Sequence, residues 1–271
     1  MKKIKQNRAV AFIDVLGFKN MISSYTASEL GNKYKQATFC GLEKYKLNVD
    51  ISNELSFFPE LHKNQEDYCL SYMFSDSIIL TSHDAREESC LKLLIFVFKL
   101  TRAMIIQGFP IRGAISFGDM FADTQSSVFV GQALTEAYEL EMKQEWIGVT
   151  IHDNLVKAFP KIFNNQKYLN LYCKFLFVKY SVPMKNGPIK DEYTVNWRFN
   201  ILSKEGTKKL FPTSKEWSGQ RKIENTLAYA KYIRENQLAY LPSNTDCPVE
   251  IRTFFVSDVE PTSSLKHGDE Y

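Results

Sequence analysis

Two short apolar runs in the first third of the chain each contain one aspartate: Asp14 within AFIDVLGF (11–18) and Asp76 within MFSDSIIL (73–80). Runs of this length, rich in Phe, Ile, Val and Leu, predict β-strands. A carboxylate flanked by such side chains is expected to be half-buried, and an unpaired buried charge is strongly destabilising. Either aspartate alone could end a strand and cap the following helix. Two of them favour a sheet that holds a cation between the carboxylates.

A hard divalent ion suits such a pair of carboxylates. Mg²⁺ and Mn²⁺ take oxygen ligands and keep positions for water and for substrate phosphates. Gly17 follows the first run at the expected start of a helix, where it allows a tight turn and leaves backbone amides free. Amides at a helix start favour phosphate oxygens. Together these features indicate a metal-dependent site for a nucleoside triphosphate.

Strands and helices are expected to alternate along most of the chain. Strands are predicted at 9–15, 68–82, 110–118, 120–124, 146–151, 172–181, 191–200 and 249–256, and helices at 18–46, 86–107, 130–143, 152–159 and 220–238. A polar segment at 48–66 separates the first helix from the second strand. This order predicts an α+β fold, with helices packed on one face of a mainly antiparallel sheet.

Composition and charge argue against several classes of protein. With 271 residues and 44% hydrophobic composition, the chain can bury one large core. A net charge of +3 without a basic run gives no sign of nucleic-acid binding. The apolar stretch 91–106 contains Lys92, Lys99 and Arg102, so it is not expected to span a membrane. Five scattered cysteines and a basic N-terminus without a signal segment predict a reduced, cytoplasmic protein.

Four stretches in the first 151 residues resemble motifs of the class III nucleotide cyclases, and in particular those of the bacterial pyrimidine cyclases of Pycsar anti-phage systems. The stretches are FIDVLGF (12–18), FSDS (74–77), IRGAISFG (111–118) and VGQALTEAYEL (130–140), in the family's order. VNW (195–197) is a pattern associated with the pyrimidine group. The resemblance implies a ferredoxin-like catalytic fold that forms a head-to-tail homodimer, with its active sites between the two subunits.

The resemblance also implies a reaction, in which the ribose 3′-hydroxyl attacks the α-phosphorus and releases pyrophosphate to give a 3′,5′-cyclic nucleotide. Asp14 and Asp76 match the family's metal-binding aspartates, and Val15 matches the residue that lends a carbonyl to one of two Mg²⁺ or Mn²⁺ ions. Arg112 matches an arginine that touches the triphosphate, although it could instead pair with a surface acid. The turn expected to lie against the phosphates comprises Val15, Leu16, Gly17 and Phe18.

The chain departs from related cyclases at several site positions. Thr135 and Glu139 stand where relatives carry a ribose-positioning asparagine and a transition-state arginine. Tyr72 and Val128 stand at the two base-reading positions. The Tyr72 ring would fill the space of a purine's second ring and so favours a smaller base, unless this side chain is a core aromatic. Lys185 could reach a γ-phosphate across the dimer interface or remain a solvated loop lysine.

These features favour a homodimeric pyrimidine cyclase, with UTP ahead of CTP because cyclic UMP is the commoner product in the group that the chain resembles. The alternatives are a purine cyclase, another metal-dependent phosphotransfer enzyme, and a nucleotide-binding module without turnover. The resemblance further implies an anti-phage role through a separate effector that binds the cyclic nucleotide. We expect a catalytic domain over 1–200, a helix-and-strand appendage over 201–260 and a disordered tail over 261–271.

Overall fold

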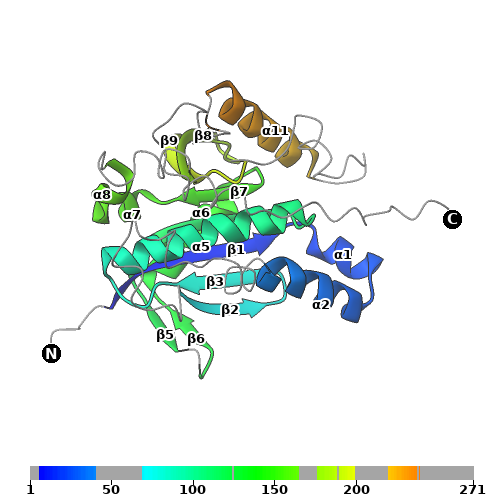
Figure 1. Ribbon diagram of the computed structural model, residues 1–271, viewed down its shortest axis with the longest axis horizontal. Coiled ribbons are helices and arrows are strands. Elements are labelled where there is room, and N and C mark those ends of the chain that lie inside the picture. Colours follow the sequence, from blue (N-terminus) through cyan, green and yellow to red (C-terminus); the bar gives the residue numbers. More distant parts are fainter. Residues whose placement is uncertain are drawn as a thin grey trace, which may run out of the picture.

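Strand β1 (Asn7–Val15) lies inside a seven-stranded sheet in the computed structural model of the chain (Figure 1). The structure describes residues 6–40, 69–123, 125–164, 176–187, 189–198, 219–236 and 238. β1 pairs with β3 (Ser77–Thr81) on one side and with β4 (Ile111–Asp119) on the other. The sheet order is β2-β3-β1-β4-β7-β9-β8, where the remaining strands are β2 (Leu70–Phe74), β7 (Gly148–Ile151), β9 (Ile189–Val195) and β8 (Phe177–Val182).

The first four strands and their connecting helices form a βαββαβ unit. Helices α1 (Phe18–Ser24) and α2 (Ala27–Lys35) lie between β1 and β2 in the chain, and α5 (Glu87–Ile106) connects β3 to β4. Every neighbouring pair within β2-β3-β1-β4 is antiparallel. This connectivity and strand order are those of a ferredoxin-like fold. The predicted α+β class and ferredoxin-like core are therefore confirmed, and the parallel pairing of β4 with β7 extends the sheet beyond that core.

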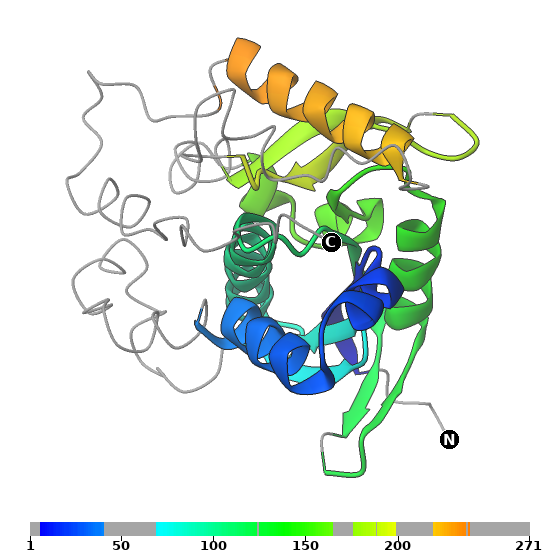
Figure 2. The same cartoon turned by 90° about the vertical axis from the view of Figure 1, so that its right-hand side faces the viewer.

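Helices cover both faces of the sheet, so the expectation of a single covered face was wrong. On one face, apolar residues of β1 join the main core together with α5; those from β1 are Ala9, Ala11, Ile13 and Val15. On the other face, Val10 packs with Ala133 of α6 (Gln132–Lys143), and the Phe12 and Tyr138 rings meet edge to face at 5.3 Å. Figure 2 shows teal α5 and green α6 on opposite sides. The reason is that β1 is apolar at both alternate sets of positions.

The single helix predicted at 18–46 is divided. Its described part consists of α1, α2 and a π-helical turn, η1 (Gln36–Cys40), and 41–46 lie outside the described residues. The break falls at Tyr25 and Thr26, which are both extended. Thr26 and Glu29 form a capping box, in which the Thr26 side chain accepts from the Glu29 amide and the Glu29 carboxylate accepts from the Thr26 amide. This pair starts a new helix at Ala27.

The single strand predicted at 68–82 is a hairpin of two strands. Phe74 of β2 pairs with Ser77 of β3, so Ser75 and Asp76 form a two-residue turn. Ser75 has a φ of 55°, the left-handed conformation that such tight turns require. Asp76 therefore lies in the turn between the strands rather than within one of them.

A small hairpin of β5 (Phe121–Asp123) and β6 (Val128–Val130) projects from the body of the protein in both views (Figures 1 and 2). Gly131 links this hairpin to α6. A Cβ atom at Gly131 would lie 2.3 Å from the carbonyl oxygen of Asp119, which is far inside contact distance. The entry of α6 therefore requires glycine, because the backbone passes directly against the end of β4.

The remaining described helices lie in the second half of the chain and comprise α7 (Asp153–Ala158), α8 (Pro160–Asn164) and α11 (Gln220–Glu235). Although α11 was assigned to an appendage, it packs into the main core through Ile223, Tyr229 and Ile233. The Tyr229 ring lies 4.9 Å from Trp146 and 4.8 Å from Tyr180. The strand predicted at 249–256 and the tail at 261–271 lie outside the described residues, and the domain boundaries stay predictions. None of the described helices combines the length and the apolar character needed to cross a bilayer.

Candidate active site

The end of β1 and the β2–β3 turn place Asp14 and Asp76 at the same end of the sheet. Asp14 pairs in register with Ser77, the first residue of β3. Asp76 directly precedes Ser77, and its carbonyl oxygen accepts a hydrogen bond from the Val15 amide at 2.9 Å. Both aspartates are half-buried. The turn that carries one carboxylate is thus tied by a backbone hydrogen bond to the strand that carries the other.

Burial and neighbouring carboxylates oppose the charge on Asp14. Burial raises the pKa of Asp14 to about 6, with further contributions from the charges of Glu141 and Asp76, while Arg112 acts in the opposite direction. None of the ion pairs among the described residues includes Asp14. Ionised Asp14 therefore lies in a partly desolvated site that a bound cation would stabilise.

Arg112 is committed to a buried ion pair with an acid that the sequence analysis did not single out. Arg112 lies opposite Asp14 in the β1–β4 register. Its Nε donates to Oε1 of Glu141 on α6 at 2.5 Å, and the two side chains are only 7% and 1% exposed. Glu141 lies on the same helix face as Ala137, which is four residues earlier and also buried. An acid on that apolar stripe is the feature of the sequence that could have indicated a buried partner for a cation. Arg112 thus pairs with an acid, as the alternative prediction stated, but this acid is buried and does not lie at the surface.

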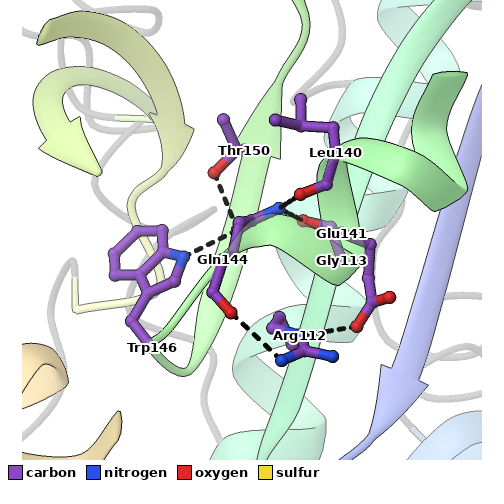
Figure 3. A network of polar contacts seen from close by, with 7 residues as sticks. All are labelled: Arg112, Gly113, Leu140, Glu141, Gln144, Trp146 and Thr150. Carbon is purple, nitrogen blue, oxygen red and sulfur yellow. Dashed lines mark hydrogen bonds and ion pairs between the residues drawn. The ribbon is translucent and has the colours of Figure 1, made fainter. Parts of the chain in front are cut away.

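The Arg112 side chain is also held by the backbone around Gln144 (Figure 3). A terminal guanidinium nitrogen of Arg112 donates to the Gln144 carbonyl at 3.1 Å. The Gln144 side chain in turn donates to the Gly113 carbonyl at 2.9 Å and accepts from Trp146 at 2.7 Å and from Thr150 at 2.9 Å. Arg112 is therefore fixed by a fully buried polar network, and the predicted contact with triphosphate would have to come from its remaining N–H groups.

Two lysines lie near this pair. Lys185, in the turn after β8, is close enough to Glu141 to oppose the rise that burial causes in the pKa of that carboxyl, and its amide donates to the Lys143 carbonyl at 2.9 Å. Lys222 of α11 is half-buried, and its pKa is lowered by burial and by the charges of Arg112 and Lys185. Nothing local in the sequence marked Lys222, because its position depends on where α11 docks. These lysines lie next to the Arg112–Glu141 pair, and of the three cations Arg112 is the one whose charge acts on Asp14.

The turn after β1 partly matches the expected phosphate-binding backbone. Gly17 has a φ of 74°, so the predicted need for glycine at this turn is confirmed. The amides of Val15 and Leu16, however, donate to the carbonyls of Asp76 and Pro110 at 2.9 and 2.8 Å. Of the four turn residues, only Gly17 and Phe18 therefore have amides without a backbone acceptor in the described part of the chain.

The expected base-reading residues lie on neighbouring elements. Tyr72 of β2 is half-buried, and its ring lies 5.2 Å from the Phe129 ring of β6. Val128, next to Phe129, is 42% exposed. The contact with Phe129 shows that Tyr72 packs against the β5–β6 hairpin, which brings both predicted positions into one region.

Thr135 and Glu139 are exposed on α6, on the side of the helix that faces away from buried Ala137 and Glu141. The Thr135 hydroxyl donates to the Gly131 carbonyl at 3.3 Å, and Glu139 lies 3.9 Å from Lys143. No contact among the described residues joins either side chain to Asp14 of the same chain. A role in the site would require a second subunit.

Comparison with solved structures finds cyclase domains among the similar chains. The dimeric guanylyl cyclase domain of the RhoGC fusion protein from the aquatic fungus Blastocladiella emersonii is 11% identical, with a TM-score of 0.43, over 70% of this chain and 94% of that chain. The adenylyl cyclase CyaB from P. aeruginosa is 10% identical, with a TM-score of 0.41, over 72% and 96% of the two chains. A search of family models and of curated proteins finds no match.

The donor set at Asp14 and Asp76 fits a hard divalent cation. Two carboxylates and a nearby backbone carbonyl at Val15 offer oxygen ligands only. Across the described ranges, no group of three or more His, Cys, Asp or Glu side chains is placed to hold a metal ion. The remaining ligand positions of a cation at this site would therefore fall to water and substrate oxygens, as is usual for Mg²⁺.

Proposed function

We propose that this protein is a class III nucleotide cyclase that converts a pyrimidine nucleoside triphosphate, UTP in the first place, to its 3′,5′-cyclic monophosphate and pyrophosphate. The observation that carries the proposal is the placement of Asp14 and Asp76 at the same end of a βαββαβ sheet, with Arg112 opposite Asp14 on the neighbouring strand. Carboxylates that hold divalent cations beside cationic side chains are what phosphoryl chemistry requires.

Each part of the site has a role in this reaction. Asp14, Asp76 and the Val15 carbonyl would hold two Mg²⁺ or Mn²⁺ ions, which when bound lower the pKa of the attacking hydroxyl and neutralise the leaving pyrophosphate. Lys185 and Lys222, which lie next to the Arg112–Glu141 pair, would attract the triphosphate, and the Gly17 and Phe18 amides would donate to it. Arg112 contributes positive charge from a fixed position.

The decisive experiment is incubation of purified protein with each of the four ribonucleoside triphosphates and Mn²⁺, followed by identification of the products by mass. Cyclic UMP with pyrophosphate is the expected result. Cyclic CMP, or a cyclic purine nucleotide, would keep the reaction and change the substrate. Binding without a cyclic product would favour a silent nucleotide-binding module, which the exposed Thr135 and Glu139 support because neither supplies the family's asparagine or arginine.

Tyr72 is proposed to limit the size of the base pocket. Tyr72→Ala should raise kcat/KM for ATP and GTP relative to UTP by about tenfold or more, because a steric barrier is removed while the aspartates stay. The measurement is kcat/KM for all four triphosphates, with Tyr25→Ala, at an exposed position between α1 and α2, as the control. Unchanged selectivity would assign Tyr72 to packing against Phe129 alone.

The active form is proposed to be a homodimer that uses the exposed side of α6. Apolar side chains are exposed there and on the β5–β6 hairpin: Tyr138, Met142, Phe121, Val128 and Val130. A stable interface should bury more than about 1,000 Å². Met142→Glu should shift the protein toward monomer in sedimentation velocity and reduce turnover with it, whereas Ile22→Glu on exposed α1 should do neither. A monomer of Met142→Glu with full activity would contradict the shared site.

The reaction is proposed to take place in the cytoplasm, and the resemblance supports a role for its product as an anti-phage signal. The cyclic nucleotide would act through a separate effector that binds it, and neither nucleic acid nor membrane is a proposed partner.

A further inference from the structure

Tyr34 of α2 lies against the backbone at the end of β1. Its ring is 5.7 Å from Phe18, which follows the Gly17 turn, and 5.6 Å from Phe109. The residue after Phe109 is Pro110, whose carbonyl accepts the Leu16 amide at 2.8 Å. The Tyr34 ring is therefore held between the two segments that flank the strand end carrying Asp14.

The Tyr34 hydroxyl has no hydrogen-bond partner among the described residues, and its oxygen is buried. A buried hydroxyl without a partner is costly and needs an explanation in a native structure. The pKa of Tyr34 is raised, by burial first and then by the charges of Asp76 and Asp14, so this phenol lies in the field of the carboxylate pair and keeps its proton. It is thus a hydrogen-bond donor without an acceptor in the described part of the chain.

A second buried tyrosine shows how this fold satisfies a phenol when its role is structural. Tyr229 of α11 is fully buried, and its hydroxyl lies 3.1 Å from the Thr194 hydroxyl and donates to the Val195 carbonyl at 3.2 Å. The core thus supplies partners to a tyrosine that only packs. Tyr34 differs because no described residue accepts from its hydroxyl, although the charges of Asp76 and Asp14 act on it.

We propose that Tyr34 is a positioning residue of the cation site, whose hydroxyl donates a hydrogen bond to the water shell of a divalent cation held by Asp14 and Asp76. The inference rests on the cation of the proposed function, but not on the identity of the nucleotide. Groups that bond to the ligands of a metal orient them, and their loss typically costs about 10–100-fold in metal affinity. Tyr34→Phe removes only the hydroxyl and keeps the ring.

The test is a titration of purified full-length protein with Mn²⁺, followed by electron paramagnetic resonance, together with thermal melts without metal. Tyr34→Phe should weaken Mn²⁺ binding by about tenfold or more. It should leave the metal-free melting temperature unchanged or raise it, because an unsatisfied group is removed. Tyr229→Phe, the matched control, should lower the melting temperature and leave Mn²⁺ affinity unchanged. Asp76→Asn should abolish binding.

The outcomes separate this inference from the proposed function. Wild-type Mn²⁺ affinity in Tyr34→Phe would overturn the inference, and cyclic UMP formation by that variant would leave the proposed function standing. Weakened binding in a protein that cyclises no triphosphate would support the role of Tyr34 while the proposed function fails. A wild-type protein that binds no Mn²⁺ would overturn both.

Discussion

Asp14→Asn is expected to reduce cyclisation of the preferred triphosphate by at least about a thousandfold. Asparagine keeps the shape of the side chain but removes the negative charge that holds a divalent cation, and such an ion is worth several kcal/mol of transition-state stabilisation. Steady-state rates with Mn²⁺ measure the effect. Asp153→Asn is the matched control, because Asp153 is exposed on α7 and pairs with Lys157. Turnover close to wild type in Asp14→Asn would remove Asp14 from the metal site.

The same variant should be more stable than wild type when no metal is present. The pKa of Asp14 in the folded protein, about 6, lies above its ordinary value of 3.8, so folding favours the protonated form. The stability advantage of protonated Asp14 is complete below pH 4 and is lost as the pH rises through 6. The gap in melting temperature between Asp14→Asn and wild type should therefore open between these two values and stay constant above them. Added Mn²⁺ should stabilise wild type alone.

The main features of the fold could be predicted because they depend on local periodicity. A short run of apolar residues marked β1, the helix pattern marked α5 and α6, and their order implied an α+β sheet. Two errors had signals in the sequence. Thr26 and Glu29 have the spacing of a capping box, and Ser75 and Asp76 are turn-forming residues between two apolar runs. Both lie inside longer predicted elements, because the helical pattern continues on both sides of Thr26 and the strand pattern continues on both sides of Ser75 and Asp76.

The residues that surround Asp14 and Arg112 could not be predicted in the same way. Lys222 comes from α11 and Tyr34 from α2, and each reaches the site only through tertiary packing. A sequence pattern states which face of a helix is apolar, but not against which strand that face docks. Glu141, the partner of Arg112, could be predicted in part. It lies on the buried stripe of α6, so its burial could be expected, whereas its contact with Arg112 of β4 could not.

Arg112→Ala is expected to destabilise the protein by about 3–5 kcal/mol, because it leaves Glu141 buried without its partner. For a chain of this size the loss corresponds to a fall of about 10 °C in melting temperature. Low activity in Arg112→Ala would therefore not show whether Arg112 contacts the triphosphate, because the loss of stability alone would lower the activity.

A double variant separates the two roles of Arg112. Arg112→Met with Glu141→Leu replaces the buried ion pair by apolar side chains of similar size, a change that is often neutral or stabilising. Its melting temperature should lie well above that of Arg112→Ala. A double-mutant cycle, which compares the double variant with the two single variants, measures the coupling energy between the two side chains. If Arg112 also faces the triphosphate, the folded double variant should still lose about a hundredfold in turnover, by analogy with the loss of one donor to developing charge. A folded double variant with full turnover would give Arg112 a purely structural role. Other cations would then have to neutralise the triphosphate, and Lys185 and Lys222, which lie next to Glu141 and Arg112, are the ones to replace next.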